Sequence, residues 1–255
     1  MSVLCGGMER SGSTLQYQLA KEIVETAGLG EGKGWVNDAS MEELIRTKPD
    51  DRYYVIKSHA YLKSFDQLPR KLCVYSYRDA RDVVVSLMRK NDKTFDEVCD
   101  WAMLQKLVNN FRKWTSLDQV HIAKYETFNK DLETATGQLA AFLGAKELNA
   151  SQVASIAAAF SIDAQKKRME AVKAGEGEVL EIQGQMVSGS SLLHSNHIQS
   201  GESGDYEQYL TRGEIAFIEH SIGAWMTKNG YPLTIGKLEA SCRYGWRRLK
   251  TKLSV

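Results

Sequence analysis

The chain has 255 residues and a formal net charge of +1, from 33 basic and 32 acidic side chains. This balance gives no overall electrostatic attraction to nucleic acid or to a membrane surface, so we expect neither as a partner. No basic region followed by an apolar stretch opens the sequence, and no apolar run approaches the ~20 residues of a membrane span.

The cysteines are few and far apart, at positions 5, 73, 99 and 242, without a C-x-x-C pair. This spacing favours reduced thiols over a disulfide framework or a zinc site. We therefore expect a cytoplasmic protein, and no metal is implied.

The first predicted elements are a buried strand over residues 2–5 and a helix over about 15–27, which Gly28 ends. The residues between them, G-M-E-R-S-G-S-T at 7–14, are spaced like the phosphate loop G-x-x-x-x-G-K-[ST]. Ser13 replaces the lysine of that motif, and a positive charge lies three residues earlier, at Arg10. A glycine turn that opens a helix binds anions through its backbone N–H groups. The loop therefore predicts an anion site, but not one for the end of a triphosphate.

Short apolar strands and helices alternate along the rest of the chain. This alternation predicts a single α/β domain over residues 1–255, with a parallel sheet flanked by helices. We expect further strands at 53–56, 72–75 and 120–123, and helices at about 80–90, 95–114, 130–143, 150–170 and 211–229.

Two segments near the C-terminus differ in composition from the rest. Residues 175–204 are rich in Gly and Ser with little periodicity, which is typical of a functional lid or a disordered segment, and we expect a flexible lid. Residues 237–252 carry six basic side chains and one acid, and we expect a terminal helix there. That helix is either a solvated surface helix or one that docks on an acidic partner.

Lys57-Ser58-His59 directly follows a predicted strand, where ligands of open parallel sheets bind. In this position His59 can act as a general base and Lys57 as a fixed charge. A histidine after a strand is also commonly a hydrogen-bonded structural residue, so both interpretations remain open here.

The run R-D-A-R-D-V-V-V-S at 78–86 also joins a strand to a helix. Arg78 and Ser86 can hold one phosphate together, the guanidinium in a bidentate manner. Alternatively, Asp79 is a magnesium ligand of a phosphoryl-transfer enzyme, or the run is a self-neutralising surface ion-pair cluster. The run alone does not decide between these three interpretations.

The order of these segments resembles that of the sulfotransferases that use 3′-phosphoadenosine 5′-phosphosulfate (PAPS). The resemblance extends from about residue 3 to residue 210. It rests on R-S-G-S-T, K-x-H after a strand, R-D-x-R-D-V-V-V-S, a strand ending in Tyr125-Glu126, and G-x-x-G-D-Y. It implies a P-loop-like α/β fold, PAPS as donor and 3′-phosphoadenosine 5′-phosphate (PAP) as product, with no metal.

The resemblance also implies roles for individual residues. The loop that holds the 5′-phosphosulfate consists of Arg10, Ser11, Gly12, Ser13 and Thr14. Arg78 and Ser86 hold the 3′-phosphate, Tyr125 approaches the adenine, and Gly201 belongs to a late donor-binding loop. The catalytic residues are Lys57, His59 and Arg10, with His59 as general base.

The sequence departs from the family pattern in two places. Gln199 and Ser200 stand where the late loop of the family has Arg-Lys, and Leu15 stands where cytosolic members have a tryptophan. Both departures favour the bacterial and carbohydrate branch over the steroid and phenol branch.

We expect a small-molecule or carbohydrate acceptor with a hydroxyl or amine group, bound by segments around 34–48, 88–110 and 175–200. The alternatives are a P-loop kinase, which needs the lysine that Ser13 replaces, and a non-catalytic nucleotide-binding protein.

Overall fold

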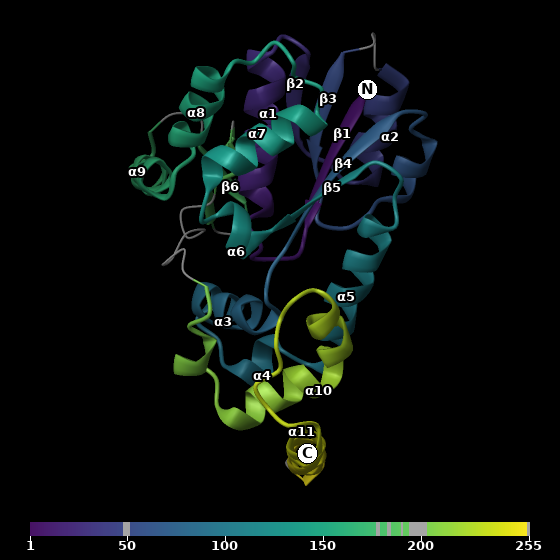
Figure 1. Ribbon diagram of the computed structural model, residues 1–255, viewed down its shortest axis with the longest axis vertical. Helices are drawn as coiled ribbons and strands as arrows, with labels where there is room; N and C mark the ends of the chain where they lie inside the picture. Colours follow the sequence, from purple (N-terminus) through teal and green to yellow (C-terminus); the bar gives the residue numbers. More distant parts are fainter. Residues whose placement is uncertain (48–51, 177–178, 183–184, 190, 194–202, 254–255) are drawn as a thin grey trace. The chain divides into compact units, whose positions relative to one another are not determined.

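The computed structural model describes residues 1–47, 52–176, 179–182, 185–189, 191–193 and 203–253 (Figure 1). The chain divides into two compact units. Unit 1 contains Met1–Tyr77 and Lys113–Gly201, and unit 2 contains Arg78–Arg112 and Glu202–Val255. That the whole chain forms a single domain stays a prediction.

Unit 1 is built on a five-stranded sheet in the order β2-β3-β1-β4-β5, in which every pair is parallel. The strands are β1 (Ser2–Gly7), β2 (Gly30–Trp35), β3 (Tyr53–Lys57), β4 (Lys71–Tyr77) and β5 (Val120–Lys124). The α/β class and four of these strands are confirmed. In register, Cys5 of β1 lies opposite Lys57 of β3, and Gly7 lies opposite Ser76 of β4.

The edge strand β2 was not predicted, because its sequence G-E-G-K-G-W lacks the β-branched residues that usually mark a strand. Its glycines allow a close approach to neighbouring segments. A Cβ at Gly30 would lie 2.0 Å from the Tyr53 carbonyl oxygen, and one at Gly32 would lie 2.6 Å from the Lys21 side chain. The helix α2 (Asp38–Thr47), which follows β2, was also not predicted.

One face of the sheet is covered by α1 (Ser13–Thr26), α7 (Leu132–Phe142) and α8 (Ala150–Ala159). Alternate residues of the central strands meet these helices in one core, among them Val3, Cys5, Val55 and Val74. The opposite face is covered by aromatic side chains. The fully buried Trp114 packs there against Tyr61, Phe65 and Tyr75, and its ring lies where Gly6 has no side chain.

Two predicted helices are each interrupted by a capping residue. The segment predicted as 95–114 is α4 (Phe95–Val98) and α5 (Trp101–Thr115), because Asp100 accepts a hydrogen bond from the Met103 N–H at 2.7 Å. The segment predicted as 150–170 is α8 and α9 (Ile162–Lys173), where Ser161 accepts from the Ala164 N–H. The short helix α6 (Tyr125–Phe128) directly follows β5.

Unit 2 contains α3 (Ala80–Asn91), α4, the part of α5 up to Arg112, α10 (Arg212–Lys228) and α11 (Lys237–Leu253). Phe95 of α4 packs edge-on against Phe217 of α10, and Phe111 of α5 packs edge-on against Trp225. The helix α11 confirms the predicted C-terminal helix. No helix in the described ranges is both long and apolar enough to span a membrane.

The segment predicted as a lid contains regular structure. Strands β6 (Val179–Ile182) and β7 (Gln185–Ser188) form a two-stranded antiparallel sheet, which the Gly- and Ser-rich composition did not predict. The role of the segment as a lid stays a prediction.

Candidate functional site

The predicted phosphate loop connects β1 to α1 and is held against β4. The Met8 N–H donates to the Ser76 carbonyl oxygen at 2.9 Å. Two residues in the loop have left-handed backbone angles, Arg10 (φ 60°) and Gly12 (φ 75°). This conformation is unusual for a residue with a side chain, and such strain is concentrated at functional sites. The turn therefore holds the Arg10 backbone in a strained conformation.

Ser11 supports the loop from inside. Its side chain is buried, and its hydroxyl lies 2.7 Å from the Met8 carbonyl, 3.0 Å from the Ser76 carbonyl and 2.8 Å from the Ser76 hydroxyl. Its N–H points to the Met8 carbonyl oxygen at 3.3 Å. These contacts fix the turn, and the predicted donor contact of Ser11 stays a prediction.

The N-terminus of α1 has the properties of an anion site. Its N-cap Gly12 makes no side-chain cap, and the first turn has no acidic residue. The first N–H groups of a helix have no partner within the helix and lie at the positive end of its dipole. Ser13 is buried and Thr14 half-buried at this turn. Backbone N–H groups, rather than a lysine at position 13, are therefore the anion ligands that this loop offers.

Tyr125 lies beside the loop. A Cβ on Gly12 would lie 3.0 Å from the Tyr125 ring and 2.7 Å from the Phe128 ring, so only glycine fits between loop and rings. Tyr125 and Phe128 pack edge-on, at the start and end of α6. The structure thus brings Tyr125 to the loop, and its predicted contact with adenine stays a prediction.

Lys57 is the last residue of β3 and is 1% exposed. Within the described part of the chain its Nζ has no hydrogen-bond partner. Burial lowers the pKa of Lys57 to about 7, and it raises the pKa of the neighbouring Cys5 thiol to about 12. The thiol is therefore neutral near pH 7 and does not balance the ammonium. A buried cation without a partner, at the same edge of the sheet as the loop, suits a bound anion.

His59 follows two residues later and is half-buried. Its ring packs edge-on against the indole of Trp35, with the ring centroids 5.0 Å apart at 62°. Trp35 is the last residue of β2 and lies opposite Lys57 in register. The structure therefore brings three side chains to the carboxyl ends of neighbouring strands: Lys57, His59 and Trp35. Trp35 was not among the predicted site residues.

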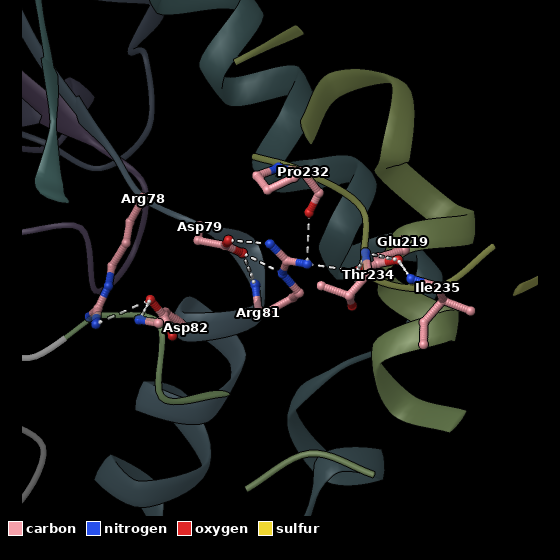
Figure 2. Close-up of polar contacts among 9 residues, drawn as sticks. Arg78, Asp79, Arg81, Asp82, Glu219, Pro232, Thr234 and Ile235 are labelled. Carbon is pink, nitrogen blue, oxygen red and sulfur yellow. Dashed lines mark hydrogen bonds and ion pairs between the residues drawn. The ribbon is translucent and has the colours of Figure 1, made fainter. Parts of the chain in front are cut away.

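In unit 2, Arg78 precedes α3 and is held by a carboxylate from that helix (Figure 2). Its Nη2 lies 3.8 Å from Oδ2 of Asp82, and the same oxygen accepts the Gly204 N–H at 2.9 Å. Burial raises the pKa of Asp82 to about 6, although the charge of Arg78 acts in the opposite direction. Asp82 thus connects the Arg78 side chain to the backbone N–H of Gly204.

Arg81 and Asp79 form an ion pair with each other, and Figure 2 shows their contacts with the neighbouring segments. Arg81 donates to both carboxylate oxygens of Asp79, at 3.0 and 2.6 Å, and to Glu219 of α10 at 2.6 Å. Asp79 also caps α3 by accepting the Arg81 N–H at 2.9 Å. With both of its oxygens bound to a guanidinium, Asp79 does not match a magnesium ligand. The cluster is ionic, as one interpretation held, but it is buried rather than on the surface.

The other predicted residues are placed as follows. Ser86 is half-buried on α3, eight residues after Arg78. Both belong to unit 2, whereas the loop, Lys57, His59 and Tyr125 belong to unit 1. Gly201, Gln199 and Ser200 lie outside the described residues.

Three supporting residues were missed: Ser76, Trp35 and Glu219. Ser76 could have been found as a small polar residue in a buried strand, and Glu219 as an acid within the apolar face of a helix. Trp35 ends a Gly-rich run that carried no strand pattern, so no sequence signal indicated its place.

A family model described as the sulfotransferase domain matches residues 2–230. Among solved structures, mouse sulfotransferase SULT7A1 complexed with PAP is similar at TM-score 0.62 and 18% identity, over 95% of this chain and 87% of that chain. Retinol dehydratase in a complex with retinol and PAP is similar at TM-score 0.61 and 18% identity, over 92% and 83%.

A second complex of retinol dehydratase, with androsterone and inactive cofactor PAP, gives TM-score 0.59 and 17% identity, over 92% of this chain and 82% of that chain. At such identities the likeness shows a shared fold. No individual curated protein sequence matches the chain significantly.

The raised pKa of Asp82 predicts a pH-dependent stability. Because its folded pKa of about 6 exceeds the ordinary aspartate pKa of 3.8, the folded state holds the proton more tightly, and stability falls as pH rises through this interval. Asp82→Asn mimics the protonated acid. We expect its melting temperature to rise relative to the wild type between pH 4.5 and pH 7, as measured by thermal unfolding.

Asp92→Asn, at an exposed helix C-cap of the same unit, is the control and should show no such trend. If the difference in melting temperature between Asp82→Asn and the wild type is constant across this pH range, the Asp82 carboxyl does not have a raised pKa.

Proposed function

The chain belongs to the sulfotransferase domain family, and on this premise we propose that it transfers a sulfonate group from PAPS to a hydroxyl or amine acceptor. Unit 1 binds the phosphosulfate end of the donor where β1 and β3 end. When bound, PAPS supplies an activated sulfonate group with a phosphate oxygen as leaving group. Every other contribution comes from the side chains and backbone of this protein.

The observation that carries the proposal is the buried Lys57 ammonium, which has no hydrogen-bond partner among the described residues. Keeping it charged is unfavourable unless an anion completes the site. An anionic donor also raises the lowered pKa of Lys57, because a nearby negative charge favours the ammonium. Lys57 therefore gains its full charge when it stabilises charge on the sulfonate.

The remaining roles are those that the sequence resemblance implies. The N–H groups at the start of α1 and the Arg10 guanidinium hold the phosphosulfate and neutralise charge that develops on the leaving oxygen. His59 accepts the proton of the acceptor hydroxyl, since an imidazole is a suitable base near neutral pH. Arg78 and Ser86 bind the 3′-phosphate, Asp82 orients Arg78, Tyr125 approaches the adenine, and Gly201 belongs to the late donor-binding loop.

In this proposal the acceptor is a small molecule. The sequence predicts, more specifically, that it is a carbohydrate. The solved relatives contain retinol and androsterone, which are small hydroxyl compounds. A cytoplasmic location remains part of the proposal.

Binding of PAP tests the donor assignment. In thermal shift titrations, PAP should stabilise the protein by about 2.7 kcal/mol at 100 times its Kd, while ATP with Mg²⁺ should stabilise it little. Arg78→Ala should reduce the affinity for PAP at least ~10-fold with little change for 5′-AMP, because 5′-AMP lacks the 3′-phosphate.

Arg89→Ala, an exposed arginine of the same helix, is the matched control and should bind both nucleotides normally. Equal losses for PAP and 5′-AMP in Arg78→Ala would show that Arg78 does not bind the 3′-phosphate. If ATP with Mg²⁺ stabilises the protein and PAP does not, PAPS is not the donor.

Replacing His59 tests the general base. His59→Ala should lower sulfonate transfer from labelled PAPS by ~100-fold or more, while the stabilisation by PAP persists. His220→Ala, at an exposed histidine of α10, should transfer at the wild-type rate. Unchanged turnover in His59→Ala would overturn this role.

A further inference from the structure

We propose that Trp35 is the surface on which the acceptor packs, and that the acceptor hydroxyl is therefore carried by a flat ring. This inference rests on the proposed function and names the class of acceptor. Trp35 is 50% exposed, although an indole of this size is usually well buried. Its edge contact with His59 places the exposed indole next to the proposed general base.

The backbone on one side of Trp35 is shaped to aim the indole. The pairing of β2 with β3 shifts register between Gly32 and Gly34, and Gly34 has φ +76°. Such a bulge redirects the side chain that follows, and only glycine adopts this φ without strain. The Gly34 N–H donates to the Tyr17 hydroxyl at 2.9 Å, and Tyr17 is buried on α1. The helix that begins at the phosphate loop thus also holds the bulge.

On the other side, the backbone is fixed to the strand that carries the proposed catalytic residues. The Val36 N–H donates to the Lys57 carbonyl oxygen at 3.0 Å, and the Trp35 Cα is paired with the Lys57 Cα. The main chain of Trp35 is therefore held on both sides, while half of its side chain remains open. A rigid backbone with an open aromatic face is what a stacking platform requires.

The chemistry of the indole selects its partner. An aromatic ring stacks on it in an offset arrangement, and the apolar face of a pyranose packs on it in the same way. Such aromatic contacts add to the burial of apolar area. Loss of the indole is expected to weaken a ring acceptor about tenfold, which corresponds to about 1.4 kcal/mol. An acyclic alcohol has no flat face and loses little.

The test compares three acceptors with PAPS as donor: naphthol, methyl glucopyranoside and hexanol. Trp35→Ala should raise KM about tenfold for at least one ring acceptor, with a smaller change in kcat and no change in the KM for hexanol. Trp35→Phe should restore most of the ring acceptor's affinity. The ring acceptor that responds identifies the source of the flat face, aromatic or carbohydrate. Ile122→Ala, an exposed apolar residue on the opposite edge strand β5, should leave all three KM values unchanged.

A binding measurement covers the case in which none of the three alcohols is turned over. The indole N–H resonance of Trp35, assigned by its loss in Trp35→Phe, should shift when naphthol or methyl glucopyranoside is added to the PAP complex. No shift with either compound, or equal KM changes for hexanol and the ring acceptors, overturns the role of Trp35. Stabilisation by PAP is measured for both Trp35→Ala and the wild type. If PAP stabilises neither protein, the proposed function fails, and the result does not bear on Trp35 alone.

Discussion

The parallel pairing of β1 with β3 and β4 is the constraint on which the site depends. It sets Cys5 opposite Lys57 and Gly7 opposite Ser76, so the phosphate loop and the K-x-H segment reach the same edge of the sheet. The loop is then tied to β4 through Met8 and Ser11, and β2 is tied to β3 through Val36. A shift of one residue in the pairing of β1 with β3 would turn the Lys57 side chain to the other face of the sheet, and such a shift in the pairing of β1 with β4 would turn Ser76 away from the loop.

Buried charged side chains have different surroundings in the two units. In unit 2, Arg81 donates to several acceptors, and Glu219 in turn accepts from Thr234 and Ile235, so the charges of this network satisfy one another. In unit 1, Lys57 is as deeply buried but lacks such acceptors in the described chain. Replacing one partner of a satisfied network is strongly destabilising, whereas neutralising a solitary buried charge relieves a penalty. This contrast distinguishes a structural arginine from a lysine that the fold holds for a ligand.

Much of the fold could be predicted because its strands and helices have clear periodicity. The phosphate loop could be predicted because a glycine turn that opens a helix has few other roles. The strand β2 could not, since its formation depends on glycines fitting against Tyr53 and Lys21 rather than on strand propensity. The sequence also could not separate Arg78 from Arg81. Both occur in one R-D-x-R-D run, and only the fold brings Glu219, 138 residues away, to Arg81. Likewise, the place of Trp35 beside His59 depends on a bulge held by Tyr17.

Lys57 is buried and has no hydrogen-bond partner in the part of the chain that the structure describes. We propose that the fold keeps it so for an anionic donor, and Lys57→Met tests this most directly. Without ligand at pH 7, we expect the melting temperature to rise by about 4 °C or more, while sulfonate transfer is lost. Because the folded pKa of Lys57, about 7, lies below the ordinary lysine pKa of 10.5, the wild type gains stability as pH rises between these values, and the difference in melting temperature between Lys57→Met and the wild type should shrink. Lys71→Met is the control and should be destabilised, since the Lys71 Nζ donates to the Phe65 carbonyl oxygen at 3.0 Å. A destabilised Lys57→Met, or one that still transfers sulfonate at the wild-type rate, would contradict the claim.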